Sequence, residues 1–141
     1  MKILGLHHVA IAVDDIEKYS SIFENIFGLK RGPIETNKAN GVSLSFLDVV
    51  NSKLEFIKPL LDDSPIGKFI AKRGSGIHHF CLIVDDVAAA VEELKSKNMR
   101  MIDDKPRPGA EGSLIAFIHP ESAGGILIEL KQEKNKDLRS E

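Results

Sequence analysis

The sequence predicts an α+β protein in which two βαβββ modules form a single curved mixed sheet. Three observations support this fold class: a twelve-residue segment that occurs twice, a helical pattern directly after each copy, and short strand-like runs after each helix. Because one βαβββ module cannot cover both faces of its own sheet, we expect the two copies to combine around a shared interior.

The repeated segment reads "GLHHVAIAVDDI" at Gly5–Ile16 and "GIHHFCLIVDDV" at Gly76–Val87, 71 positions later. Identical residues in the two copies are the Gly, both His, one Val and both Asp, and most other positions exchange one apolar residue for another. A match without gaps that includes a His pair indicates an internal duplication. Alternating apolar residues predict that each copy is a strand.

Each copy is followed by a helical pattern. Apolar residues at helical spacing predict a helix from Ile16 to Phe27, with Asp14 or Asp15 as its N-cap and Gly28 ending it. The second helix begins near Val87 and has Asp85 or Asp86 as its N-cap. A short basic helix is expected around 66–72, between the modules.

Short apolar runs predict the remaining strands at 42–49, 53–59, 100–104, 113–120 and 125–132. The Pro and Gly content of 105–113 predicts a loop. We therefore expect a single domain over 1–131, made of repeats at about 4–60 and 75–131, followed by a loosely ordered charged tail at 132–141.

Composition excludes several classes of function. With 28% charged residues and a net charge of −2, the 141-residue chain has no bulk field for holding nucleic acid or an anionic membrane. Its longest apolar runs are far shorter than the ~20 residues of a membrane span, and no signal-peptide pattern is recognisable. The single cysteine, Cys81, excludes an internal disulfide framework, so we expect a cytoplasmic protein.

Candidate metal ligands emerge when the strands are divided into faces. In the repeated strands, the bulkier residues share a face with His7 and His78, while His8 and His79 lie with smaller residues. We expect the bulky faces to pack on the helices, His8 and His79 to line a cavity, and His7 and His78 to lie frayed at the strand entrances.

Two acidic residues interrupt apolar strands in matching places. Glu55 lies in "KLEFIKP" and Glu129 in "GILIELK", 74 positions apart, close to the spacing of the histidines. A carboxylate at such a position is costly unless it is paired or bound to a metal. Two imidazoles and two carboxylates suit a divalent first-row metal such as Co, Ni, Mn or Zn. The sequence therefore predicts a metal site formed by His8, Glu55, His79 and Glu129.

Each of these residues taken alone has a more ordinary interpretation. A single strand His is more often structural, and a single strand Glu is more often an exposed edge residue. The duplication favours the metal site because four such residues recur in two modules. Cys81 shares a face with His79, but its counterpart in the first copy is Ala10, so we interpret Cys81 as a packing residue.

The module order and the His…Glu…His…Glu set resemble the vicinal oxygen chelate superfamily, which includes the glyoxalase and bleomycin resistance proteins. Within it, the chain is most similar to the methylmalonyl-CoA epimerases. The segments that carry this resemblance are "HHVAIAVDDIEK", "DSPIGKFIAKRGSGIHHFCLIVDDV", "PRPGAEG" and "FIHPESAGGILIEL", and it extends over about 6–131.

This resemblance implies metal ligation by His8, His79 and Glu129, while a family position that is Gln in some members falls on Glu55. It implies epimerisation of methylmalonyl-CoA through an enolate. Because the duplicated site supplies acids on two sides, either Glu55 or Glu129 could serve as proton acceptor if its metal bond loosens on substrate binding. Some epimerases have a Glu proposed as a base two residues after the "GV" that matches 41–42, and this chain has Leu44 there. A glyoxalase I-type isomerase of a glutathione hemithioacetal and a non-catalytic binding protein are the alternatives.

An acyl-CoA substrate requires positive charge near its phosphates. Candidates for this role are Lys68, Lys72, Arg73, Lys105 and Arg107, although any one of them is more often a solvated surface residue. The resemblance also implies a homodimer, and neither a nucleic acid nor a membrane is expected as a partner.

Overall fold

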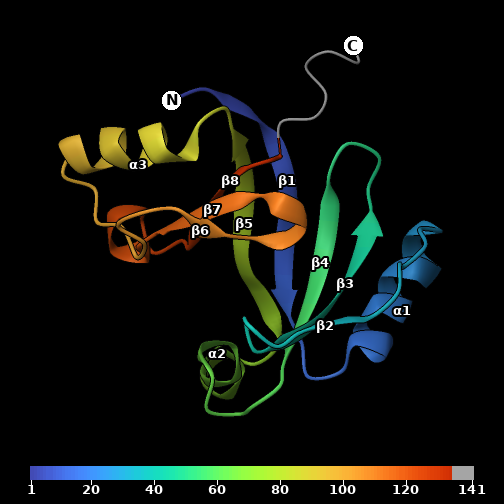
Figure 1. Ribbon diagram of the computed structural model, residues 1–141. Helices are drawn as coiled ribbons and strands as arrows, with labels where there is room; N and C mark the ends of the chain where they lie inside the picture. The colour runs from blue at the N-terminus through green and yellow to red at the C-terminus, as the bar shows by residue number, and fades with distance from the viewer. Residues whose placement is uncertain (135–141) are drawn as a thin grey trace. The chain divides into compact units, whose positions relative to one another are not determined.

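The computed structural model describes residues 1–134, and residues 135–141 of the predicted charged tail lie outside this part. The chain divides into two compact units, His8–His79 and Met1–His7 together with the chain from Phe80 onward. In chain order the main elements are β1 Ile3–Ala12, α1 Ile16–Phe27, β2 Glu35–Asn37, β3 Val42–Asp48, β4 Lys53–Pro59, α2 Pro65–Arg73, β5 Gly76–Val84, α3 Val87–Ser96, β6 Arg107–Pro108, β7 Leu114–Ile118 and β8 Ile128–Gln132 (Figure 1).

The first unit, His8–His79, has the strand order β2-β3-β4-β1-β5. β1 and β4 run parallel, while β3 is antiparallel to both β2 and β4. Its helix α1 begins and ends where the sequence predicts, because the Asp15 side chain accepts a hydrogen bond from the N–H of Lys18 and Gly28 adopts a left-handed φ of 67°.

The second unit repeats this topology with the order β1-β5-β8-β7-β6. β5 and β8 run parallel, and β7 is antiparallel to both β8 and β6. Helix α3 is capped by Asp86, whose side chain accepts a hydrogen bond from the N–H of Ala89. The predicted α+β class and the two βαβββ modules are confirmed.

Three predicted segments differ from the structure. The polar strand β2 was not predicted, because its three residues have no apolar alternation. The predicted loop 105–113 contains the short strand β6 and a 3-10 turn at Ala110–Gly112. The expected strand at 100–104 is wrong, since only an isolated bridge between Met101 and Ile118 forms there.

Each unit has an apolar core on the helix-covered face of its strands. In the first unit, Val13, Ile16, Leu47 and Phe56 form the buried cluster under α1. In the second unit, residues of α3 pack on β5, β7 and β8, with Val84, Val91 and Leu130 among the buried members. The prediction that the bulkier strand faces pack on the helices is confirmed.

Helix α2 packs against the opposite face of the first unit. Its N-cap is Ser64, whose hydroxyl accepts a hydrogen bond from the N–H of Gly67 at 3.2 Å. A Cβ at Gly67 would lie 2.3 Å from the carbonyl oxygen of Asp62, so no larger residue fits without moving the backbone. This close approach explains the Gly of "SPIGKF" and places Phe69 and Ile70 on the buried cluster formed by Ala10, Ala12 and Ile57.

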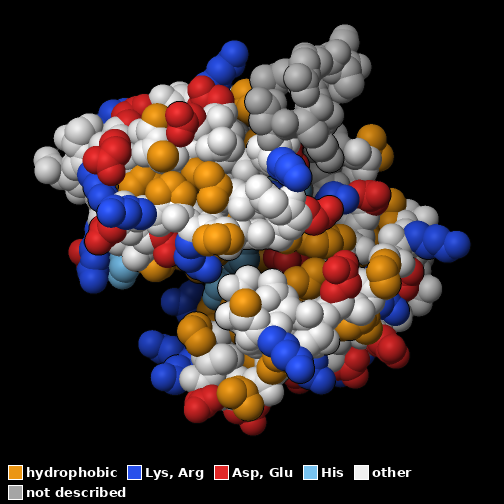
Figure 2. Space-filling view, in the orientation of Figure 1, with side chains coloured by type: hydrophobic (Ala, Val, Ile, Leu, Met, Phe, Trp, Pro, Cys, Tyr) orange, Lys and Arg blue, Asp and Glu red, His pale blue; other side chains and the backbone are white. Residues whose placement is uncertain are grey.

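Among the described residues, no helix is long and apolar enough to span a membrane. On the face shown in Figure 2, Lys and Arg side chains are interspersed with Asp and Glu. This mixture agrees with the small net charge of −2.

Candidate metal centre

His8 and His79 meet inside the first unit. His8 lies on β1 and His79 on β5, and their side chains are buried, with residue exposures of 4% and 7%. Nε2 of His8 lies 3.4 Å from Nε2 of His79, and the two rings are nearly perpendicular. The structure therefore brings these two histidines together, although helices α1 and α2 and three strands lie between them along the chain.

Glu55 joins the two histidines. It lies on β4, in register with Ala10 on β1 and with Phe46 on β3. Its Oε1 atom lies 3.3 Å from Nε2 of His8, and the residue is 9% exposed. The ring of Phe46 packs edge-on against His8 with a centroid distance of 6.0 Å, which restricts the imidazole on that side.

These separations fit a shared ion. Two nitrogen ligands bonded to one Zn²⁺ at tetrahedral angles lie about 3.3–3.4 Å apart, given Zn–N bonds of about 2.0–2.1 Å. The distances of 3.4 Å and 3.3 Å between these donor atoms match that value. Two imidazoles and a carboxylate are also a donor set that suits Zn, Co, Ni or Mn. The residues present therefore fit a divalent metal.

Glu129, the fourth predicted ligand, belongs to the other compact unit. It lies on β8 in register with Cys81 on β5 and is 8% exposed. It is thus a buried carboxylate near the start of a strand, whereas the sequence predicts it in the middle of one. Its place in that unit corresponds to the place of Glu55 in the first. Glu55 lies opposite Ala10, two residues after His8, and Glu129 lies opposite Cys81, two residues after His79.

His78 does not lie frayed at a strand entrance as predicted. Its Nδ1 atom lies 2.9 Å from Nδ1 of His79, and its ring packs edge-on against Phe69 of α2 with a centroid distance of 4.9 Å. Burial lowers the pKa of His78 to about 4, aided by the charges of His79 and Arg73. The repeated His pair draws attention to His78 in the sequence. The alternation of side chains along a strand, however, wrongly predicts that His78 points away from His79.

Comparison with known proteins shows the family to which this fold belongs. Residues 7–117 match the family model described as the Glyoxalase/Bleomycin resistance protein/Dioxygenase superfamily. The mitochondrial methylmalonyl-CoA epimerase of Mus musculus is 41% identical over 132 residues, which cover 93% of this chain and 74% of that protein. The chain belongs to the methylmalonyl-CoA epimerase family within this superfamily.

Two further relatives extend the comparison. An ethylmalonyl-CoA/methylmalonyl-CoA epimerase of Cereibacter sphaeroides is 38% identical, over 90% of this chain and 96% of that protein. The crystal structure of methylmalonyl-CoA epimerase from Mycobacterium tuberculosis has a TM-score of 0.87 and 33% identity, covering 99% of this chain and 93% of that one. The predicted resemblance to the epimerases and the vicinal oxygen chelate fold are confirmed.

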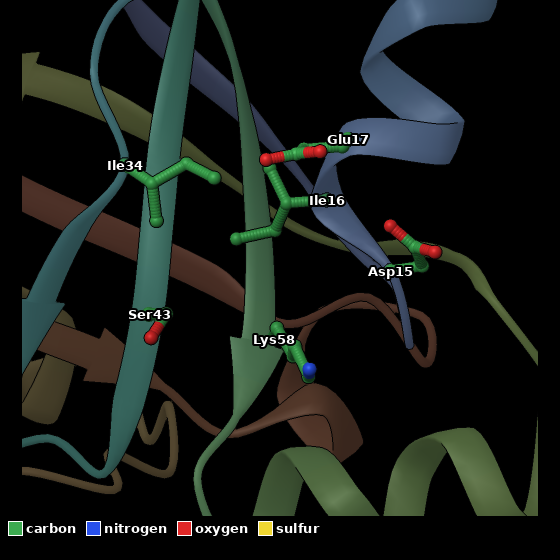
Figure 3. Close-up of a pocket in the computed structure, with 6 residues that line it drawn as sticks. All are labelled: Asp15, Ile16, Glu17, Ile34, Ser43 and Lys58. Atoms are coloured by element: carbon green, nitrogen blue, oxygen red, sulfur yellow. The ribbon is translucent and has the colours of Figure 1, made fainter.

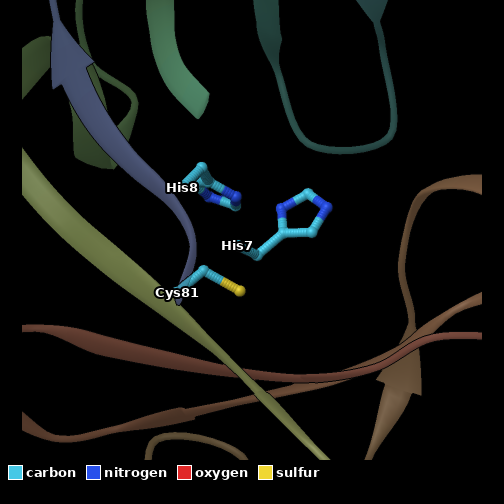
Figure 4. A group of neighbouring side chains, drawn as sticks. All are labelled: His7, His8 and Cys81. Carbon is cyan, nitrogen blue, oxygen red and sulfur yellow. The ribbon is translucent and has the colours of Figure 1, made fainter. Parts of the chain in front are cut away.

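This family member also places Cys81 and His7 near each other in its second unit (Figure 4). A ring nitrogen of His7 lies within 4.8 Å of Sγ of Cys81. Nε2 of His7 is also 3.8 Å from a carboxylate oxygen of Glu133. Cys81 itself is fully buried, as expected of a packing residue.

Leu44, at the family position that some epimerases fill with Glu, is an apolar packing residue here. It lies on β3 and packs against the cluster of Ala10, Ala12 and Ile57. A leucine has no group that accepts or donates a proton, so this member has to use other residues for proton transfer.

The basic residues predicted to contact phosphates differ in whether their side chains are exposed or already hydrogen-bonded within the protein. Lys68, Lys72 and Arg73 are exposed on α2, and Lys and Arg side chains gather over α2 at the lower left of Figure 2. Arg107 is instead engaged, because its Nε donates a hydrogen bond to Asp103 at 2.9 Å. The basic face of α2 is therefore the better candidate for binding an anionic substrate.

A separate pocket of about 220 Å³ lies beside the start of α1 (Figure 3). Its lining residues are Asp15, Ile16, Glu17, Ile34, Ser43 and Lys58. None of the predicted metal ligands contributes to it, so this pocket is not the candidate site.

Proposed function

We propose that this protein is a metal-dependent isomerase that interconverts (R)- and (S)-methylmalonyl-CoA through an enolate. The observation that carries the proposal is the buried group formed by His8, His79 and Glu55 in a member of the epimerase family. Nε2 of His8 lies 3.4 Å from Nε2 of His79 and 3.3 Å from Oε1 of Glu55, and such a buried group is expensive unless a cation neutralises the carboxylate and orients the rings.

We assign the four ligands of a divalent ion to His8, Glu55, His79 and Glu129. The assignment of Glu129 is supported by the equivalence of the modules. Glu55 lies opposite Ala10, two residues after His8, and Glu129 lies opposite Cys81, two residues after His79. Because side chains two positions apart share a strand face, each Glu belongs on the same face as the His of its own module.

Methylmalonyl-CoA has an acidic C2–H between a thioester carbonyl and a carboxylate. Removing this proton places negative charge on the thioester oxygen. When bound, a divalent metal supplies Lewis-acid stabilisation of that developing charge. Histidine and carboxylate ligands accommodate Co, Ni, Mn or Zn, and this donor set does not select among them.

Epimerisation also requires proton acceptors on both faces of the planar enolate, because the proton returns to the face opposite the one it left. We assign these roles to Glu55 and Glu129, the two carboxylates that are buried on equivalent strands of the two modules, each acting when its bond to the metal loosens on substrate binding. The apolar Leu44 takes no part in proton transfer.

We assign the binding of the CoA phosphates to the basic side chains of α2. Lys68 and Lys72 are one helical turn apart and exposed, and Arg73 follows at the helix end. Cationic side chains so placed bind phosphate oxygens through charge-assisted hydrogen bonds.

The relatives reported above are named epimerases, which favours this function over a glyoxalase I-type isomerase or a non-catalytic binder. We also propose a homodimer in the cytoplasm. Dimerisation is supported by exposed apolar residues at the start of β1, namely Ile3, Leu4 and Leu6. The cytoplasmic location is supported by the cysteine content, because a sequence with one cysteine forms no internal disulfide and fits a reducing compartment.

Deuterium exchange at C2 of methylmalonyl-CoA tests the proposed reaction. The metal-loaded protein is incubated with the CoA ester in D₂O, and in parallel with a glutathione hemithioacetal. We expect deuterium at C2 and no isomerisation of the hemithioacetal. Isomerisation of the hemithioacetal without deuterium at C2 would favour a glyoxalase I-type isomerase. Inactivity on both substrates would favour a non-catalytic binding protein.

A further inference from the structure

The contact between His78 and His79 has no role in the function described so far. Adjacent residues of a strand usually point to opposite faces, yet Nδ1 of His78 lies 2.9 Å from Nδ1 of His79. Nδ1 is the ring nitrogen nearer to the backbone, so two neighbouring histidines can reach each other at this atom while their outer nitrogens point away. The rings stand nearly perpendicular, at 81°.

This geometry allows only one proton between the two Nδ1 atoms. Either His79 donates its Nδ1–H to His78, or His78 donates to His79. The two arrangements differ at the other end of His79, because a neutral imidazole with its proton on Nδ1 has an unprotonated Nε2. Nε2 of His79 is the atom that faces Nε2 of His8 at 3.4 Å, and it is therefore the metal donor.

We infer that His78 is a positioning residue that accepts the Nδ1–H of His79 and so keeps Nε2 of His79 in the unprotonated form that binds a metal. The inference rests on the proposed metal site and extends it by one residue. Metal-bound histidines generally donate their second ring N–H to a fixed acceptor, and such acceptors set both the tautomer and the ring orientation.

The acceptor is itself held in place by α2. The ring of Phe69 packs edge-on against His78 at 79°, and the guanidinium of Arg73 lies 5.5 Å from the centroid of the Phe69 ring. His78 is half-buried by this packing. It is therefore a fixed ring at the base of the ligand rather than a mobile surface residue.

Two substitutions distinguish the hydrogen-bond acceptor of His78 from the packing of its ring. His78→Phe keeps an aromatic ring against Phe69 but removes the acceptor. His78→Asn loses the ring but places a carbonyl oxygen at the position of Nδ1, where it still accepts a hydrogen bond. The neighbouring Ile77→Ala, at a residue that is 68% exposed, controls for a general disturbance of β5.

The first readout is the tautomer of His79 in the metal-free protein, measured by ¹⁵N NMR of the histidine side chains. We expect the proton on Nδ1 in the original protein, in His78→Asn and in Ile77→Ala, and loss of this preference in His78→Phe. A His79 proton on Nε2 in the original protein overturns the inference, even if a variant fails to fold.

The second readout is the affinity for Co²⁺, measured by competition with a chelator. Loss of such an acceptor typically weakens metal binding about 10–100-fold, so we expect this change in His78→Phe, near-normal binding in His78→Asn and no change in Ile77→Ala. Unchanged affinity in His78→Phe overturns the inference. His79→Ala tests the metal site separately: if Co²⁺ binding survives that substitution, the proposed site itself is wrong.

Discussion

Oε1 of Glu55 lies 3.3 Å from Nε2 of His8, across two parallel strands that place both side chains on one face. The sequence repeats this relationship, because Glu129 occupies in β8 the position that Glu55 occupies in β4. A duplicated module has thus supplied the same pair of chemical groups twice.

Glu55→Gln and Glu129→Gln are each expected to weaken metal binding and slow C2 proton exchange. Both substitutions keep the size and shape of the side chain and remove only the negative charge. Isothermal titration with Co²⁺ measures the first effect, and deuterium exchange measures the second. Glu92→Gln is a matched control, since the Glu92 side chain is 73% exposed on α3. Normal metal affinity in both site variants would remove the two carboxylates from the ligand set.

Leu44→Ala is expected to leave the turnover number unchanged, because leucine transfers no proton. The variant should nevertheless lose about 2 kcal/mol of unfolding free energy, at the low end for Leu→Ala, since Leu44 is partly buried against Ile57. Urea unfolding measures the stability and C2 exchange measures the activity. A large fall in exchange by a folded Leu44→Ala protein would give this position a direct part in the reaction.

Asp85 is expected to make stability depend on pH in acid. The N–H of Lys2 donates a hydrogen bond to its carboxylate at 3.0 Å, and this bond lowers the pKa of Asp85 below its ordinary value of 3.8. The unfolded chain therefore binds the proton first as pH falls. The stabilisation is present above the ordinary value and is lost as pH falls through the lowered pKa.

Asp85→Asn should accordingly reduce the unfolding free energy at neutral pH and have little effect in strong acid. Urea unfolding at several pH values measures this difference. Asp14→Asn, the corresponding change in the first copy of the repeat, is the control. The lowered pKa of Asp85 would be contradicted as the cause if Asp85→Asn lost as much unfolding free energy in strong acid as at neutral pH.

The proposed homodimer makes Leu4 a sensitive position. Leu4 is 57% exposed at the start of β1, beside the exposed Ile3 and Leu6. If this strand forms the dimer contact, Leu4→Asp places a charge in an apolar interface and should yield monomers by light scattering. Val50→Asp, at a residue that is 99% exposed, should leave the mass unchanged. A monomeric original protein at micromolar concentration would refute the dimer.

The elements with strong local signals could be predicted closely. The bounds of α1 follow from Asp15, which caps the first turn, and from Gly28, which takes the left-handed conformation at its end. Strand β4 coincides with the apolar run at 53–59. Strands β2 and β6 carry no such signal, because they are short and their pairing partners rather than their own residues define them.

The candidate metal ligands could be predicted from the sequence, but the role of His78 could not. The duplication directed attention to the four candidate ligands, because it made otherwise ordinary residues recur in matching places: His8, Glu55, His79 and Glu129. The position of His78 was not predictable from alternation. Its ring contacts His79 and packs against Phe69 of α2, and the position of a neighbouring helix is not visible in the pattern of a single strand.

In the proposed mechanism, an ion bound at His8 and His79 enables proton exchange at C2 of methylmalonyl-CoA. The most direct measurement is the exchange rate of metal-stripped protein during a Co²⁺ titration, followed by NMR in D₂O. We expect almost no exchange without metal, a linear rise that ends at about one ion per chain, and no recovery in folded His8→Ala or His79→Ala. Full exchange by the stripped protein, or full recovery in either variant, would contradict the claim.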